Sequence, residues 1–465
     1  MSITAKKYLF IIINVFFLFL YADDLKPILS NIEEYQLDNG MNVLIAPNYD
    51  NPIVYIYMYL NVGEMDSPMD KTDLASWTFQ QMKNETDKYD RNDIKNKLFS
   101  FGNESGKFVW YGMESEFSYI ENYCLKQDTR ECLELMAEIL INPTFSYRDT
   151  FWKKILTRIA PKQVFQDEWY LFNHHSSNLY ANTKVNFSPH KTLKLKKRDM
   201  KKWHEQHVRP ENVTIVIAGD VNYIYIKKII NEYFSNWKSE VPLPEKRNYK
   251  INLTKQTGTK IRFVNFKNKT DATIRIITWA PGFYDDWFMA GRLVNIVFAG
   301  NPHRSRTSKI HKKFNRAGNI WTHIYHRPRM PNLSILSNTN YSDLSNYYSE
   351  MKDEFSRLAN GSITEEELES AKIHSINSYK NKIYNLESFS SLINRYYNNG
   401  YGLNDISMLS DRVNEVSIEE VNSAAKKMFD PNNFMMVVLG NKDSCATFLE
   451  QFENYEFYEQ SDELK

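Results

Sequence analysis

Apolar and polar residues alternate along two early stretches of the chain, and this pattern predicts strands. Residues 35–48, YQLDNGMNVLIAPN, predict a β-hairpin, because Asn39-Gly40 supplies the positive φ that a tight turn needs. Residues 53–63, IVYIYMYLNVG, predict a further strand. Apolar residues at helical spacing then predict helices over residues 71–83, 90–100 and 129–141.

The second half of the chain repeats the first. VRPENVTIVIAGDV (208–221) parallels FDPNNFMMVVLGNK (429–442), with a helix predicted before and after each copy. A period this long predicts two homologous domains, not a solenoid. Because strands alternate with pairs of helices in both halves, we predict an α+β fold, each domain having an antiparallel-rich sheet with helices on one face. Three residues recur at an offset of 221: Pro210 and Pro431, Asn212 and Asn433, Gly219 and Gly440.

The predicted domain boundaries follow from this repeat. An N-terminal domain is expected over residues 25–237 and its homologue over residues 253–460. Between them, KSEVPLPEKRNYKIN (238–252) is polar and contains two prolines, which is typical of a linker.

The first 22 residues have the pattern of a secretory signal. Lys6 and Lys7 precede the apolar run YLFIIINVFFLFLY (8–21), and Ala22 offers a small residue for cleavage. The run is short for a membrane span, and an uncleaved N-terminal anchor is the alternative. No later segment is long and apolar enough to cross a bilayer. We therefore expect an exported protein with no membrane span after signal removal, periplasmic or else secreted.

Charge and cysteine content bear on two questions only: whether nucleic acid is a partner and whether disulfides hold the fold. Lys+Arg is 58 and Asp+Glu 57, so the net charge of +1 gives no reason to expect nucleic acid as a partner. The three cysteines are too few for a disulfide framework. Cys124 and Cys132 could pair in an oxidising compartment, but three buried thiols is the preferred interpretation.

Several segments, in order, resemble the insulinase and mitochondrial-processing-peptidase family of inverted-zinc-motif (M16-like) metallopeptidases. LDNGMNVLIAP (37–47) is similar to that family's opening hairpin, and KTDLASWTFQQM (71–82) to the helix that carries its metal motif. HEQHVRPENVTIVIAGDV (204–221) resembles the end of its first domain. ITEEELESAK (363–372) and DPNNFMMVVLGN (430–441) resemble its second domain. The resemblance implies a two-domain peptidase fold.

The residues that do chemistry in that family are missing here. Its active helix carries His-x-x-Glu-His, a spacing that places two zinc ligands and a general base on one helical face. Laid on this chain, the motif falls on Ser76, Phe79 and Gln80, and no histidine precedes His174. A third ligand is expected near residues 151–157, but no Asp or Glu lies between Asp149 and Asp167. We therefore predict no zinc, no other cofactor and no peptidase activity of its own.

The resemblance also suggests where a substrate or partner would touch the chain. The family's substrate-facing edge strand corresponds to FVWYGMESEF, which places Val109 and Trp110 near the contact positions. In the second domain, Ser305-Arg306 resembles the family's Ser-Arg-Leu, and Trp321 lies near the position of its substrate-binding tyrosine. Val109, Trp110, Arg306 and Trp321 are the candidate contact residues.

Two functions are compatible with these observations. The first is the structural or substrate-holding subunit of a complex with a homologous chain that has an intact His-x-x-Glu-His; a homodimer is the other pairing. The second is a free-standing scaffold of the cell envelope that binds a peptide or protein. The family's second domain often supplies an Arg and a Tyr, seven residues apart, that bind substrate; here Lys312 or Lys313 lies near the position of that Arg and Trp321 near that of the Tyr. The loss of this pair favours the second function. An active metallopeptidase is the least favoured reading.

Overall fold

The computed structural model describes residues 29–460 apart from several gaps. The predicted signal segment, residues 1–22, lies outside the described residues, and so does most of the predicted linker. The chain divides into two units, each made of three segments. Unit 1 comprises residues 1–154, 190–247 and 378–411, and unit 2 the remainder. The gaps are residues 69, 72, 104, 160–167, 169–170, 173–174, 177–178, 180–193, 243–257, 301–303, 315–319, 327–330 and 398.

Unit 1 is built on a six-stranded sheet with the order β1-β2-β6-β3-β5-β4. All neighbours pair antiparallel except β2 and β6, which are parallel. The strands are β1 (Glu33–Gln36), β2 (Asn42–Pro47), β3 (Ile53–Leu60), β4 (Trp110–Met113), β5 (Ser118–Leu125) and β6 (Val213–Gly219). The helices of this unit are α3 (Leu74–Met82), α4 (Arg91–Ser100), α5 (Thr129–Ile141), α10 (Lys197–His207), α11 (Tyr223–Phe234), α16 (Leu386–Tyr397) and α17 (Leu403–Ser407), with 3-10 turns η2 (Glu64–Asp66), η3 (Lys126–Asp128) and η4 (Pro210–Asn212).

Unit 2 has a second six-stranded sheet, with the order β12-β7-β11-β8-β10-β9. Its strands are β7 (Lys260–Asn265), β8 (Ala272–Trp279), β9 (Trp321–Tyr325), β10 (Asn332–Thr339), β11 (Met435–Gly440) and β12 (Glu456–Glu459). Its helices are α12 (Phe288–Asn295), the π-helix η6 (Ile296–Gly300), α13 (Arg306–Lys313), α14 (Leu344–Ala359), α19 (Ile418–Met428) and α20 (Ala446–Leu449). Three further helices include residues of both units: α6 (Tyr147–Ile159), α15 (Glu365–Tyr384) and α18 (Leu409–Glu415).

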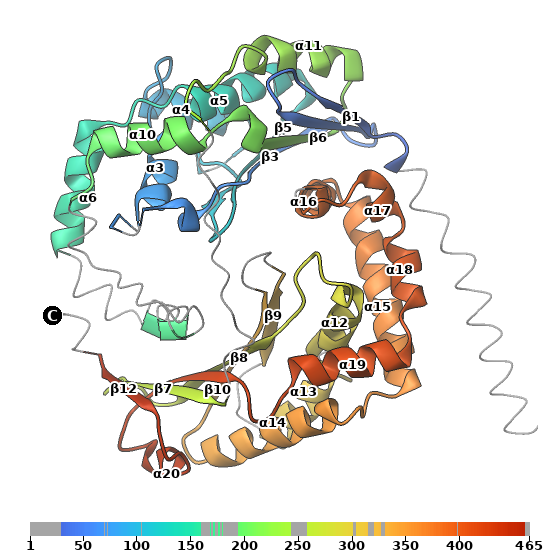
Figure 1. Cartoon of the computed structure of the whole chain (residues 1–465). Coiled ribbons are helices and arrows are strands. Elements are labelled where there is room, and N and C mark those ends of the chain that lie inside the picture. The colour runs from blue at the N-terminus through green and yellow to red at the C-terminus, as the bar shows by residue number, and fades with distance from the viewer. Residues whose placement is uncertain are drawn as a thin grey trace, which may run out of the picture. The chain divides into compact units, whose positions relative to one another are not determined.

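The predicted α+β class is confirmed, and local signals placed the early elements well. The hairpin turn has Gly40 at φ 91°, in the left-handed region that glycine adopts without steric cost. The strand predicted from residue 53 is β3, and the predicted helices are α3, α4 and α5. One helix departs from the expectation that helices cover a single face: α16 packs on β3 and β6, on the opposite side of the sheet from α5, α10 and α11 (Figure 1).

The face of the first sheet that meets α5, α10 and α11 forms the main core. Alternate residues of β3 (Val54, Ile56 and Met58) join Ile120 of β5 and Ile215 of β6 in one buried apolar cluster. Because side chains alternate across a strand, the intervening residues Tyr55, Tyr57 and Tyr59 lie on the other face.

The two units exchange equivalent pieces of chain. Residues 155–189 come from the first half of the sequence but belong to unit 2, whereas residues 378–411 come from the second half and belong to unit 1. The 221-residue offset carries 155–189 onto 376–410, so the two exchanged segments occupy matching places in the repeat. Each unit therefore completes its fold with a segment from the other half, which a linear boundary at 238–252 does not describe.

Candidate functional site

Helix α3 carries the degenerate motif, and its three motif positions lie in three different environments. Ser76 is half-buried, and its Oγ donates a hydrogen bond of 2.9 Å to Oε1 of Glu64. Phe79, at the place of the general base, is fully buried. Gln80 is exposed. The position that should move a proton is instead filled by a core aromatic ring.

Phe79 packs α3 against the edge strand β4 through contacts with Tyr111. Its ring stacks on that of Tyr111 in β4, with centroids 4.5 Å apart, and its carbonyl oxygen accepts a 2.6 Å hydrogen bond from the Tyr111 hydroxyl. The ammonium group of Lys83 lies 4.4 Å from the centroid of the same tyrosine ring. Burial, with Lys107 nearby, lowers the pKa of Lys83, and burial raises that of Tyr111. The helix thus packs and positions β4.

Metal-binding side chains do not gather on this helix. In the described part of the chain, no three His, Cys, Asp or Glu side chains are grouped so that they could hold a metal ion. The buried His204, in the WHEQH segment, hydrogen-bonds through Nε2 to the carbonyl oxygen of Leu140 at 2.8 Å. Its burial lowers its pKa to about 4, and this describes a neutral core histidine.

Trp110 and Trp321, two of the predicted contact residues, lie at matching edges of the two sheets. Trp110 begins the edge strand β4 and is 56% exposed, and Trp321 begins the edge strand β9 and is 53% exposed. Val109, immediately before β4, is half-buried. Large exposed aromatic residues at a sheet edge, where backbone groups lack a neighbouring strand, are typical of surfaces that bind extended chains.

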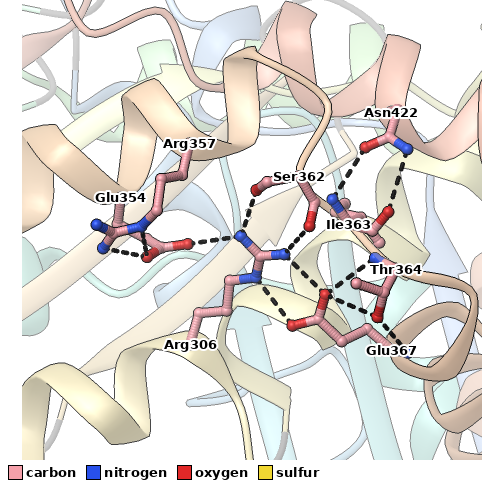
Figure 2. Close-up of polar contacts among 8 residues, drawn as sticks. All are labelled: Arg306, Glu354, Arg357, Ser362, Ile363, Thr364, Glu367 and Asn422. Atoms are coloured by element: carbon pink, nitrogen blue, oxygen red, sulfur yellow. Dashed lines mark hydrogen bonds and ion pairs between the residues drawn. The ribbon is translucent and has the colours of Figure 1, made fainter.

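Arg306, the fourth predicted contact, is buried in a network of its own unit, which Figure 2 shows. Its guanidinium bonds Oε1 of Glu354 at 2.9 Å and both carboxylate oxygens of Glu367 at 3.0 and 2.7 Å. It also donates 2.6 Å bonds to the hydroxyl and the carbonyl oxygen of Ser362. All three guanidinium nitrogens are engaged within unit 2, so Arg306 joins α13 to α14 and to the start of α15.

The electrostatics of this network suit a structural role. Burial opposes the charge on Arg306, but the hydrogen bonds that it donates to the two carboxylates hold its pKa above the usual value. Burial likewise opposes ionisation of Glu367, and the bond from Arg306 keeps its pKa low. Glu354 also accepts two bonds from Arg357, and Asn422 of α19 bonds the backbone of Ile363 beside the network (Figure 2).

The strand registers reveal equivalent rows across the two sheets. In unit 1, Trp110 of β4 pairs with Glu121 of β5, Glu121 with Tyr57 of β3, and Tyr57 with Val216 of β6. The matching row of unit 2 runs from the edge of the sheet inward through Trp321, Leu336, Arg275 and Val437. Val216 and Val437 are 221 residues apart, and both rows start with the exposed tryptophan.

Sequence reasoning missed Glu121 and the aromatic residues around it. The signal was present in the alternation of IVYIYMYL and SYIENYCL, which puts tyrosine at every second position of β3 and on both sides of Glu121 in β5. That pattern predicts strands with one core face, but the cross-strand register was needed to bring these residues together.

Comparisons with known proteins connect this chain to the M16 peptidases. Residues 194–374 match the family model described as "Peptidase M16 inactive domain". A search of curated proteins gave no match. Among the helices that the structure describes, none is long and apolar enough to span a membrane.

Several solved structures share the fold at low sequence identity. A protease from Helicobacter pylori has a TM-score of 0.76 at 15% identity, covering 88% of this chain and 99% of the other. A peptidase M16 inactive domain from Pseudomonas fluorescens has a TM-score of 0.76 at 16% identity, covering 88% and 98%. The first half of the periplasmic protease PqqL from Escherichia coli has a TM-score of 0.70 at 15% identity, covering 90% and 93%. The chain is M16-like: it has the fold of the M16 peptidases, and residues 194–374 match the inactive domain of that family.

Proposed function

We propose that this chain is an exported, non-catalytic M16-like protein that serves as the structural or substrate-holding subunit of a complex with an active zinc peptidase. The observation that carries the proposal is the side chain that α3 places at the general-base position. The helix keeps its place beside the edge strand, but Phe79 fills the general-base position with a buried ring stacked on Tyr111. Such a helix supports a binding wall without doing chemistry.

Co-purification tests the pairing. The tagged chain is expressed in its own cells and isolated under mild conditions, and its partners are identified by mass spectrometry. A stoichiometric M16-like chain with an intact His-x-x-Glu-His supports the subunit role. A monomer or homodimer alone contradicts it. The purified chain is also expected to hold no stoichiometric zinc and to leave a mixed peptide library uncut.

Export is part of the same proposal. The basic and apolar pattern of residues 1–22 supports it, and PqqL, one of the structural neighbours, is described as periplasmic. Fractionation of cells followed by N-terminal sequencing of the mature chain tests it. A mature N-terminus near Ala22 in the periplasmic or secreted fraction is the expected result, and an intact Met1 in the cytosol contradicts it.

The second candidate is a free-standing peptide- or protein-binding scaffold of the cell envelope. Its support is the pair of exposed tryptophans, Trp110 and Trp321, that begin the edge strands of the two sheets. Each tryptophan, with Val109 beside Trp110, is a proposed contact for an extended segment that pairs with the edge strand of its own sheet. Peptide binding by the purified chain, with no M16-like partner in the co-purification, favours this candidate over the first.

A further inference from the structure

The face of the first sheet opposite the main core carries a cluster of aromatic side chains. Tyr57 stacks on Tyr119 with centroids 6.2 Å apart, and Tyr55 and Tyr123 lie 5.8 Å apart. Tyr59 stacks on Phe117 at 5.2 Å. These residues come from β3, β5 and the turn before β5, and they lie on the face of the sheet where α16 packs, with Tyr57 and Tyr59 buried.

Glu121 lies in the middle of this cluster. It is flanked along β5 by Tyr119 and Tyr123, and its cross-strand neighbours are Tyr57 and Trp110. Its side chain is only 6% exposed, yet within the described residues Oε1 has no hydrogen-bond partner. A buried carboxylate oxygen without a partner loses its hydration and gains nothing in return.

The charged groups around Glu121 do not neutralise it. Burial raises the pKa of Glu121, and the negative charge of Glu387 in α16 raises it further, to about 7. Arg395 of α16 acts on Tyr57, where it opposes the rise in pKa that burial and Glu121 cause. In the part of the chain that the structure describes, no Lys or Arg forms an ion pair with Glu121. The negative charge of Glu121 also raises the pKa of Tyr55, Tyr57 and Tyr119, after the larger effect of burial at each.

We propose that Glu121 and the surrounding aromatic rings bind the cationic side chain of a lysine or arginine residue in an extended peptide held along β4. A carboxylate supplies the opposite charge, and aromatic faces attract cations through their negative quadrupole. Trp110, exposed on β4 directly opposite Glu121, lies where an incoming chain arrives. The proposal rests on the peptide-holding function above and names the side-chain chemistry that this function recognises.

The second sheet supports the proposal that this row binds a cation, because its equivalent row contains a cationic side chain of the same unit. At the position equivalent to Tyr57, it carries Arg275, whose guanidinium lies 4.6 Å from the centroid of the Phe172 ring. Phe172 belongs to the exchanged segment 155–189. One row therefore holds a cation on an aromatic ring within its own unit, and the other presents aromatic rings and a free carboxylate oxygen.

Calorimetric titration of the full chain tests the proposal with matched peptides. All are extended, N-acetylated and C-amidated, and they differ at one central residue: lysine, norleucine, arginine or citrulline. Because hydrogen bonds between charged groups are stronger than those between neutral groups, the lysine and arginine peptides are expected to bind about tenfold or more tightly than their neutral counterparts at pH 8. Glu121→Gln is expected to lose this preference and still bind the norleucine peptide as the wild type does. Glu131→Gln, which alters an exposed acid on α5, is the matched control and is expected to keep the preference.

Each outcome decides one point. Equal binding of lysine and norleucine peptides overturns the Glu121 proposal and leaves peptide holding intact. A preference that survives in Glu121→Gln also overturns it. A norleucine peptide with a free amino terminus that binds as tightly as the lysine peptide overturns the side-chain assignment. If no peptide binds at all, the cation site fails, and the subunit role is judged separately by co-purification. Circular dichroism confirms that each variant is folded.

Discussion

The two sheets share a topology across five strands, and their equivalent rows differ in how they satisfy charge. The unit 1 row contains Glu121, a carboxylate with an unpartnered oxygen among tyrosine rings. The unit 2 row contains Arg275 beside Leu336, and its face is covered by an apolar cluster that includes Phe172 and Leu179. The equivalent rows therefore hold opposite charges: in unit 2 a guanidinium lies against the Phe172 ring, and in unit 1 a carboxylate oxygen has no hydrogen-bond partner among the described residues.

This difference teaches where to look for function in a chain that lacks its catalytic residues. Packing on Tyr111 explains the position of α3, and internal ion pairs explain the burial of Arg306, so neither needs a ligand. Glu121 is one of the described side chains with a buried polar atom that lacks a hydrogen-bond partner, and it lies beside the exposed Trp110 of the edge strand. The sheet face of unit 1, and not the degenerate motif, is where binding is expected.

The largest expected effect comes from removing Arg306, the buried cation that Glu354 and Glu367 share in unit 2. Arg306→Met leaves Glu354 and Glu367 facing each other without their shared cation. Removing one partner of a buried charge pair costs about 3–5 kcal/mol, and a loss of that size in the free energy of unfolding is expected. Urea denaturation followed by circular dichroism measures it. Arg357→Met, at a half-exposed partner of the same Glu354, should cost less than about 1 kcal/mol; equal losses would contradict the structural role of Arg306.

The next effect tests whether α3 is retained for packing. Phe79→Ala removes a fully buried ring and its stacking on Tyr111, and such truncations cost about 3–5 kcal/mol. Thermal and urea unfolding measure the loss, with Gln80→Ala as the exposed neighbour that should change little. The restored motif Ser76→His, Phe79→Glu, Gln80→His is expected to be unstable and to hold no stoichiometric zinc, because it buries a carboxylate and lacks a third ligand. A stable, zinc-loaded variant would overturn this view of the helix.

Local patterns in the sequence predicted much of the fold, because hairpins, strands and amphipathic helices are encoded by neighbouring residues. The exchange of residues 155–189 and 378–411 was not predictable, since the repeat offset shows which segments match but not which sheet each one covers. Arg306 resembled a substrate contact from its motif, and its burial depends on α14 and the start of α15, far along the chain. Glu121 could not be predicted as a site, because its neighbours Tyr57 and Trp110 are set by the register of three strands.

A smaller and opposite effect is expected at Glu121. Its folded pKa of about 7 lies above the unfolded value, so its protonated form contributes stability below about pH 4.5, and this contribution is lost as the pH rises through 7. Glu121→Leu, which gives unit 1 the leucine found at the matching position of unit 2, should therefore stabilise the chain at pH 8. Allowing for solvent screening, we expect about 1–2 kcal/mol. Unfolding by urea at pH 5 and pH 8 measures it, and the gain should shrink at pH 5.

The reciprocal change sharpens the comparison. Leu336→Glu places the acid of unit 1 into the row of unit 2, next to Arg275. A nearby cation favours the ionised carboxylate, so this new glutamate should titrate below its usual pKa, and the variant should gain stability, relative to pH 4, as the pH rises. If Leu336→Glu instead loses stability relative to the wild type as the pH rises from 4 to 8, its glutamate behaves as Glu121 does and the two rows do not differ as described.

The smallest effect concerns the thiols, for which the two halves should behave alike. Cys124 and Cys132 of unit 1 and Cys445 of unit 2 are all buried and unpaired. A hydrogen bond with Cys132, and then burial, raises the pKa of Cys124, and burial raises that of Cys445 to about 12. Because the thiolate is the reactive form, native protein at pH 8 should resist iodoacetamide, and all three cysteines should be alkylated in urea. Mass spectrometry counts the added groups. Two thiols that stay unmodified in urea until a reductant is added would instead show that Cys124 and Cys132 pair, and rapid alkylation of the native chain would show that one half is open to solvent.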